Sequence, residues 1–159
     1  METFKLIAEP GKHEAVLEYV LEAPRDLVFK AYVDPQLIPQ WWGPRRYITI
    51  VEKMEAKNGG SWRYLQRDSD GNTYGFHGVY HLVEKPELVV MTFEYEGMPG
   101  HVSLNTIRLE MRNGLTRVID STVFQSVADR DGMLKTGMED GSRESVERLA
   151  ELLARLSKG

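Results

Sequence analysis

The sequence predicts an α+β domain in which a curved antiparallel sheet packs against a long C-terminal helix. Turn-forming residues recur at hairpin spacing through the middle of the chain, and apolar residues alternate with polar ones between them. Towards its end the chain changes to a helical period. Strands followed by a helix are typical of the α+β class, and we expect one such domain over residues 1–159.

Length and composition limit the class of protein. The 159 residues suit one hydrophobic core, because domains usually have about 100–200 residues. With 20 Lys and Arg against 24 Asp and Glu, the net charge of −4 argues against a nucleic-acid partner. The absence of Cys excludes disulfides and thiolate chemistry. Without a leader-like start or an apolar run of about 18 residues, we expect a cytoplasmic protein and no membrane insertion.

The first part of the chain predicts one strand and two short helices. Residues 14–23 form a β-compatible run, although period alone does not exclude a helix there. Apolar residues over 25–32 then recur at offsets of three and four, which predicts a short amphipathic helix that Pro24 can open. Asp34, followed by a proline, offers an N-cap for a second short helix that runs towards Trp41.

The middle of the chain predicts six more strands. Glycine-containing and proline-containing turns separate them, and most connections are short enough for antiparallel neighbours. We therefore expect a meander, and about seven strands in all. One of the six is apolar on both sides, which one buried sheet face alone does not explain. The six strands are expected at about 46–56, 61–67, 73–84, 88–96, 102–112 and 115–126.

A long amphipathic helix is expected over about 129–157. Gly137 and Gly141 interrupt it at about 1 kcal/mol each relative to Ala, so we expect its first half to be kinked or separate. The polar face carries alternating Glu and Arg residues. The apolar stripe consists of Leu134, Met138, Val146, Leu149, Leu153 and Leu156.

Four segments, in this order along the chain, carry a resemblance to a known family. They are APRDLVFKAYVDPQLIPQWWGP, NGGSWRY, DSDGNTYGFHGVYHLVEKPELVVMTF and GMEDGSRESVERLAELL. Together they resemble the activator-of-heat-shock-protein-90-ATPase homologue-like family, in the START-like or SRPBCC superfamily, over about 14–156. The resemblance implies a helix-grip fold, similar to the birch-pollen allergen, with a long C-terminal helix over a cavity.

The resemblance has one departure, at Ser142. The family commonly has a tryptophan directly after the second glycine of GMEDGSRES, and this chain has a serine there. If the family residue lines the cavity, as the resemblance suggests, Ser142 would widen or wet that part of it.

Aromatic and methionine side chains are the candidates for a cavity lining. Core packing is the more frequent role for any single large ring, but a helix over a concave sheet leaves space for a ligand. Trp62 and Tyr64 share one strand face, as do Phe76 and Tyr80, because alternate residues point the same way. The full set is Trp41, Trp42, Trp62, Tyr64, Phe76, Tyr80, Met91, Phe93, Met133, Met138 and Ser142.

Other motifs give no positive sign of a metal, a cofactor or a catalytic centre. His77 and His81 would lie about 13 Å apart on a strand, too far to chelate one ion, so we expect no metal and no cofactor. The acidic run at 68–72 lacks the distal Glu of a calcium loop and is more typical of a hairpin turn. Arg45 and Arg46 could attract an anion but are more typical of a solvated surface in an acidic chain.

Three functional hypotheses remain. The preferred one is non-enzymatic binding of a small apolar or amphipathic molecule, of unknown identity, in the cavity. The second is a protein-interaction module that resembles the chaperone ATPase activator, with a protein partner or a second copy of the chain. The third is an enzyme that uses an acid–base pair such as Glu110 or Asp120 with a histidine.

Overall fold

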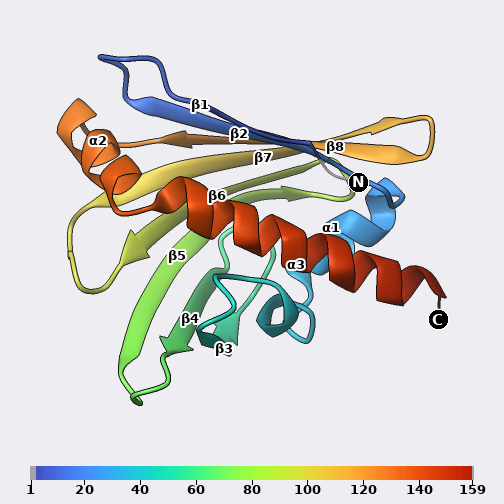
Figure 1. Cartoon of the computed structure of the whole chain (residues 1–159), viewed down its shortest axis with the longest axis horizontal. Helices are drawn as coiled ribbons and strands as arrows, with labels where there is room; N and C mark the ends of the chain where they lie inside the picture. The colour runs from blue at the N-terminus through green and yellow to red at the C-terminus, as the bar shows by residue number, and fades with distance from the viewer. Residues whose placement is uncertain (1–2, 159) are drawn as a thin grey trace.

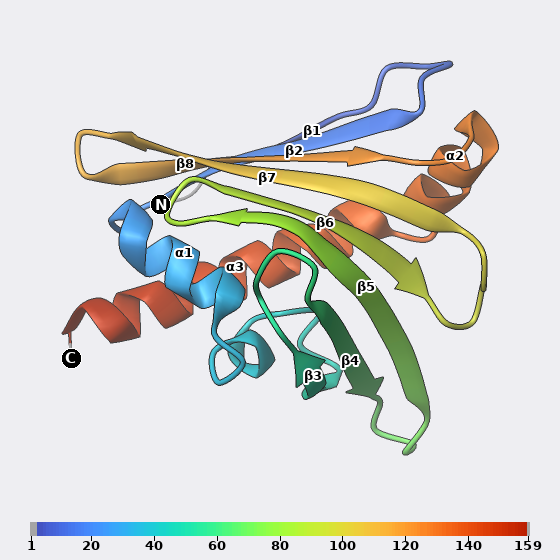
Figure 2. The ribbon, with the colours of Figure 1, turned by 180° about the vertical axis from the view of Figure 1, so that it is seen from behind.

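The computed structural model describes residues 3–158 and shows one antiparallel sheet curved around a long helix (Figure 1). The predicted α+β class and helix-grip arrangement are confirmed. Seen from behind, the strands turn progressively from one end of the sheet to the other, so that the sheet forms a concave surface (Figure 2). None of the helices within 3–158 is long and apolar enough to cross a membrane.

Most predicted elements are found within a few residues of their expected bounds. The observed ends of the strands agree best with the predicted ones where an Asn-Gly or Asp-Gly turn separates two strands, because such a turn fixes where both neighbouring strands end. The elements are β1 (Phe4–Ile7), β2 (Glu14–Leu21), α1 (Arg25–Val33), η1 (Ile38–Gln40), β3 (Ile48–Met54), β4 (Ser61–Arg67), β5 (Thr73–Glu84), β6 (Leu88–Tyr95), β7 (Val102–Arg112), β8 (Leu115–Val123), α2 (Val127–Lys135) and α3 (Met138–Lys158).

The sheet has the order β1-β2-β8-β7-β6-β5-β4-β3. Strands β3 to β8 form the predicted meander, and β2 returns to pair with β8. The short edge strand β1 was not predicted, since its four residues alternate too briefly to give a signal. It pairs antiparallel with β2, with Phe4 opposite Tyr19 and Ile7 opposite Val16. The sheet therefore has eight strands, one more than expected.

The second predicted short helix is present, but it is shorter than expected. Asp34 is the C-cap residue of α1, and its Oδ1 atom accepts a hydrogen bond from the Gln36 backbone N–H at 2.9 Å. This is the hydrogen bond of an N-cap residue, and the Asp34 carbonyl oxygen accepts from the Leu37 and Ile38 backbone N–H groups, so Asp34 opens the next turn as the sequence predicts. The regular part is η1, a single 3₁₀ turn that leads into Trp41 and Trp42.

The C-terminal segment divides into α2 and α3, as the glycine pattern predicts. The break lies at Gly137, whose φ of 87° is the left-handed conformation that favours glycine. Gly141, in contrast, lies inside α3 and does not interrupt it. The predicted stripe is correct at Val146, Leu149 and Leu153, which are buried, but Leu156 near the end of α3 is 36% exposed.

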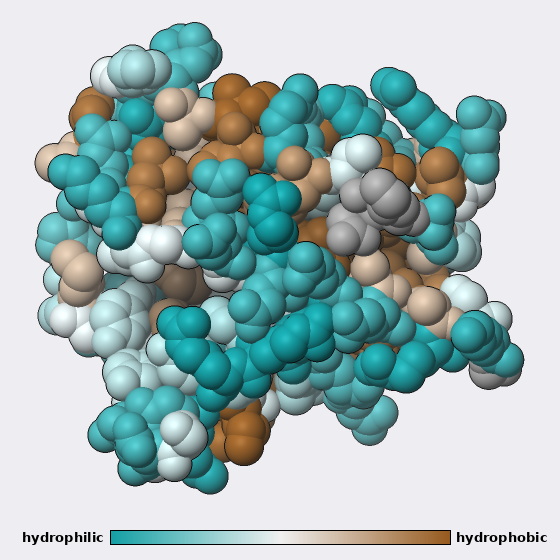
Figure 3. Space-filling model, in the orientation of Figure 1, coloured by the Kyte–Doolittle hydropathy of each residue, from teal (hydrophilic) through white to brown (hydrophobic). Residues whose placement is uncertain are grey.

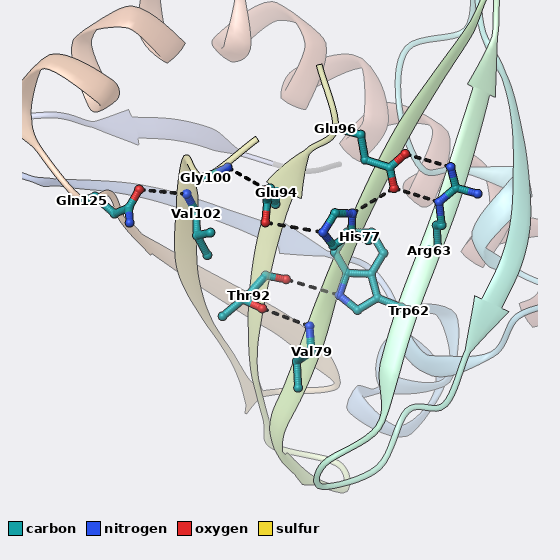
Figure 4. Close-up of polar contacts among 10 residues, drawn as sticks. All are labelled: Trp62, Arg63, His77, Val79, Thr92, Glu94, Glu96, Gly100, Val102 and Gln125. Atoms are coloured by element: carbon teal, nitrogen blue, oxygen red, sulfur yellow. Dashed lines mark hydrogen bonds and ion pairs between the residues drawn. The ribbon is translucent and has the colours of Figure 1, made fainter. Parts of the chain in front are cut away.

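Gly78 on β5 permits a close crossing of side chains between three strands. The Trp62 indole N–H from β4 donates a hydrogen bond to the Thr92 carbonyl oxygen on β6, at 3.3 Å, across Gly78 (Figure 4). A Cβ atom at Gly78 would lie 1.9 Å from that oxygen and 2.6 Å from the Trp62 Nε1 atom. A side chain at this position is therefore incompatible with the contact.

We expect Gly78→Ala to lower the free energy of unfolding by about 2–4 kcal/mol, because the overpacked site must shift and the partly buried hydrogen bond of Trp62 is lost. Gly132→Ala is the matched control, since a Cβ atom at Gly132 in α2 meets nothing within 4 Å. The control should leave stability level or raise it by about 0.5–1 kcal/mol through helix propensity. Urea denaturation measures both variants, and equal midpoints for the two would contradict this account.

Candidate ligand-binding site

A cavity of about 390 Å³ lies between the concave face of the sheet and α3. Residues from β2, β4 to β8, α1, the η1 segment, α2 and α3 all contribute to its lining. On the outside, hydrophilic residues run along the exposed side of α3, and apolar residues show in the recess beside it (Figure 3). A volume of this size lies in the range of small-molecule sites.

The structure brings the predicted lining residues together, with one exception. Tyr64 does not line the cavity; its ring packs behind the lining, 4.5 Å from the Trp62 ring and 5.0 Å from the Trp42 ring between centroids. Contact of any of these residues with a ligand stays a prediction. Those that line the cavity are Trp41, Trp42, Trp62, Phe76, Tyr80, Met91, Phe93, Met133, Met138 and Ser142.

Trp42 is the centre of the aromatic wall. Its ring contacts the rings of Trp62, Tyr64, Phe76 and Phe93, with centroid distances between 5.0 and 6.5 Å. Edge-on and tilted contacts of this kind stabilise aromatic clusters beyond simple area burial. Polar contacts hold the backbone of Trp42 in place as well, since the Thr49 hydroxyl donates to its carbonyl oxygen at 2.8 Å.

Residues of α3 close the cavity on the side opposite the sheet. Ser142 is half-buried there, beside Gly141 and Ser145. The Ser145 hydroxyl accepts a hydrogen bond from the Gly43 backbone N–H at 2.8 Å, and the Arg148 guanidinium donates to the Gly43 carbonyl oxygen at 2.7 Å. These contacts tie the loop after η1 to the helix. Small side chains on this helical turn leave the space that a larger residue would fill.

A polar group of residues also lies on the lining; the sequence analysis named only its Asp120, as a candidate acid–base residue, and did not predict it as part of the cavity. Asp120 on β8 accepts a hydrogen bond from the Asn105 amide on β7 at 3.4 Å, and the same amide donates to Thr122 at 3.0 Å. The hydroxyls of Tyr19 on β2 and Tyr32 on α1 are hydrogen-bonded to each other nearby. The sequence signal for Asp120 is the alternation along β8. Asp120 lies two residues from each of the buried residues 118 and 122, so all three side chains point to the same face of the sheet.

Burial changes the ionisation of this polar group. Asp120 is enclosed by protein, and desolvation raises the pKa of its carboxyl to about 6, with the Asn105 hydrogen bond acting in the opposite direction. Burial also raises the pKa of Tyr19 and of Tyr32, and the nearby Asp120 charge acts in the same direction. Both tyrosines therefore stay protonated at neutral pH.

One further polar atom at the lining, the Gln66 Nε2 atom, has no hydrogen-bond partner among residues 3–158, and the Gln66 side chain is 4% exposed. The Tyr80 hydroxyl, on a side chain that is 1% exposed, interacts with the Tyr64 hydroxyl, which also contacts the Met54 sulfur at 3.7 Å. An unpaired buried polar group costs about 1–3 kcal/mol, so the Gln66 amide would gain from a polar group within the cavity.

The histidines lie away from the cavity. His77 is on the convex face, where its Nδ1 atom is 2.8 Å from Glu96, and Arg63 contacts the same carboxylate (Figure 4). The Arg63 hydrogen bond lowers the pKa of Glu96 to about 2, with His77 acting in the same direction. His81 is exposed on β5. None of the four histidines lines the cavity in the described part of the chain.

Three other motifs from the sequence analysis lie in a turn or in ion pairs outside the cavity. Residues 68–72 form the predicted hairpin turn, in which the Asp68 carboxylate accepts hydrogen bonds from two backbone N–H groups. Arg45 is exposed as predicted, but its guanidinium also pairs with Glu151 on α3, with contacts of 3.1 and 2.5 Å. Of the two acid–base candidates, Asp120 lines the cavity and Glu110 does not. Glu110 instead pairs with Arg117, at 3.0 Å.

The curved sheet and the long helix over a cavity define a helix-grip protein of the START-like, or SRPBCC, type. The family model described as Activator of Hsp90 ATPase homolog 1-like protein matches residues 22–154, and the chain belongs to this family. The resemblance that the sequence motifs predict is thereby confirmed. A comparison with curated proteins finds no match.

Solved structures show the same fold. A solution NMR structure of a protein from Arthrobacter aurescens is 23% identical, with a TM-score of 0.88 over 95% of this chain and 91% of that one. A crystal structure from Rhodobacter sphaeroides is 23% identical, with a TM-score of 0.85 over 96% and 99%. The AHSA1 protein from Silicibacter pomeroyi is also 23% identical, with a TM-score of 0.74 over 89% and 97%. At these identities the similarity shows the fold.

The raised pKa of Asp120 predicts how stability depends on pH. Between the ordinary pKa of 3.8 and about 6, the folded protein binds more protons at Asp120 than the unfolded chain does. The contribution of Asp120 to stability therefore falls as the pH rises through this window and is constant above it. Asp120→Asn should stabilise the protein above pH 7 by up to about 3 kcal/mol, with the gain fading towards pH 4.

Denaturation of the wild type and of Asp120→Asn from pH 4 to 8 measures this difference. Asp70→Asn, in the exposed turn between β4 and β5, removes an equal charge outside the cavity and should track the wild type. A gap between Asp120→Asn and the wild type that stays constant with pH would show that Asp120 titrates at its ordinary value.

Proposed function

We propose that this protein binds an amphipathic small molecule in the cavity between the sheet and α3, and that it does so as a non-enzymatic binding protein. The observation that supports this proposal is a cavity of about 390 Å³ that combines an aromatic wall with polar side chains, among them Asp120, Asn105 and the unpartnered Gln66 amide. Burial of apolar ligand surface contributes about 25 cal/mol per Å², and the polar atoms orient the molecule.

The arrangement of charged groups favours binding over acid–base catalysis. Asp120 is the sole ionisable residue other than tyrosine among the lining residues that the structure describes. The third hypothesis needs a histidine beside Asp120 or Glu110, and the structure places neither pair at the cavity. A proton relay of that type therefore has no second member in the lining.

The family description names activation of the chaperone Hsp90, which would use the outer surface instead of the cavity. This interaction stays the alternative. The two functions differ in one measurable respect, because a surface interaction does not require the cavity to accept a molecule. Native mass spectrometry of the purified protein would show a co-purifying small molecule directly.

Titration with an apolar fluorescent probe tests the proposal, and Ser142→Trp locates the site. We expect saturable binding to the wild type and at least tenfold weaker binding to Ser142→Trp, because the added ring fills the cavity beside Gly141. Stability should stay level or rise, provided that the ring finds an unstrained rotamer. Ser157→Trp, at an exposed position of the same helix, is the matched control and should bind as the wild type does.

Both binding and unfolding are measured on the same preparation, since loss of affinity in a partly unfolded protein says nothing about the cavity. If neither the probe nor a panel of lipids binds saturably to the wild type, the proposed function is wrong. If both tryptophan variants bind alike, the probe binds elsewhere.

A further inference from the structure

The charge on the described part of the cavity lining is negative. Asp120 contributes a carboxylate, and no Lys, Arg, His or Glu is among the lining residues within 3–158. Buried charges in proteins are usually paired, because an isolated ion loses its hydration without compensation. The cavity therefore presents an anionic group for which the described lining provides no cation.

The hydrogen bonding of Asp120 leaves capacity for a ligand. A carboxylate can accept about four hydrogen bonds. The Asn105 amide, which donates to it at the long distance of 3.4 Å, is shared with the Thr122 hydroxyl at 3.0 Å. Asp120 keeps partial exposure, and this exposed surface faces the cavity. A donor within the cavity can reach the carboxylate without displacing a strong internal contact.

Aromatic rings lie around the same end of the cavity. Tyr19 and Tyr32 are joined through their hydroxyls and are close enough to Asp120 for its charge to act on both. The Tyr32 ring packs edge-on against the Trp41 ring, with centroids 5.0 Å apart. All three rings line the cavity. Rings of this kind beside a carboxylate attract cations, because the faces of the rings carry negative potential.

From these observations we infer that the ligand is an organic amine, with an apolar or aromatic body and a protonated amino group that pairs with Asp120. The inference rests on the proposed function and specifies its ligand class. The aromatic wall around Trp42 would hold the body, and the Asp120 end would hold the ammonium group. A fatty acid or another carboxylate fits poorly, because its charge would lie near a charge of the same sign.

The pH dependence of amine binding depends on the groups that face Asp120. These are Tyr19 from β2, Tyr32 from α1 and the neutral Asn105 from β7, and the lining residues of α2 and α3 are uncharged. Because both tyrosines stay protonated, Asp120 is the one of these facing groups that changes charge between pH 5 and 8. Amine binding should weaken progressively below about pH 6, where the carboxyl becomes protonated.

Three matched fluorescent molecules test the inference: 1-naphthylmethylamine, 1-naphthylmethanol and 1-naphthoate. They share one aromatic body and differ in head-group charge. We expect the amine to bind wild-type protein at least tenfold more tightly than the alcohol at pH 7.5, and the carboxylate to bind most weakly. Asp120→Asn should remove the amine preference while alcohol affinity changes less than threefold, and Asp70→Asn should keep the wild-type pattern.

The possible results separate the ligand class from the cavity function. Equal affinities for the three molecules, or tightest binding of the carboxylate, would overturn the amine inference and leave cavity binding standing. Failure of all three, together with the apolar probe, would overturn cavity binding itself. A pH series on the wild type needs no variant, so it decides even if Asp120→Asn does not fold: amine affinity that is flat from pH 4, near the ordinary pKa of 3.8, to pH 8 rejects pairing with Asp120.

Discussion

Helix α3 packs tightly along one half of its length, and the cavity depends on this asymmetry. Leu149, Leu152 and Leu153 are buried in its second half. The first half presents Met138, Gly141, Ser142, Ser145 and the buried Val146 to the cavity. Burial of the second half contributes about 1.5–3 kcal/mol for each large side chain, which holds the helix against the sheet. The first half can then span a hollow without making the contacts that would fill it.

The aromatic wall has its own requirement, which lies at Gly78. The side chain of Trp62 crosses β5 there and reaches the Thr92 carbonyl oxygen on β6, which a Cβ atom would prevent. The indole thus satisfies a backbone acceptor and, with its ring, contributes to the wall around Trp42. One glycine therefore permits a contact among three strands that positions a ring of the cavity lining, because a glycine within a strand allows another group to approach closely.

Sequence reasoning succeeded where the physical signal is local. The Asn-Gly and Asp-Gly turns fixed the strand bounds, and the left-handed Gly137 marked the division between α2 and α3. It predicted the cap at Asp34 but not the length of the helix that follows, which is a single 3₁₀ turn because the chain there must lead Trp41 into the core. Asp120 could be predicted only in part. Alternation along β8 indicates that its side chain points to the same face as residues 118 and 122. That no cation lies beside it among the described lining residues depends on which residues the other elements bring to the cavity, and the sequence does not show this.

The polar residues of the cavity lower the free energy of unfolding when no ligand is bound. Among the described lining residues, the Asp120 carboxylate has no cation beside it and the Gln66 Nε2 atom has no hydrogen-bond partner. Burial of such groups costs free energy that an all-apolar core would not lose. Binding changes this balance, because a ligand that favours the folded state stabilises it in proportion to its affinity and concentration. An ammonium group beside Asp120 would favour the ionised carboxylate that burial disfavours. The same residue would then lower stability in the empty protein and raise affinity in the complex, which is the trade-off expected of a binding site rather than of a packed core.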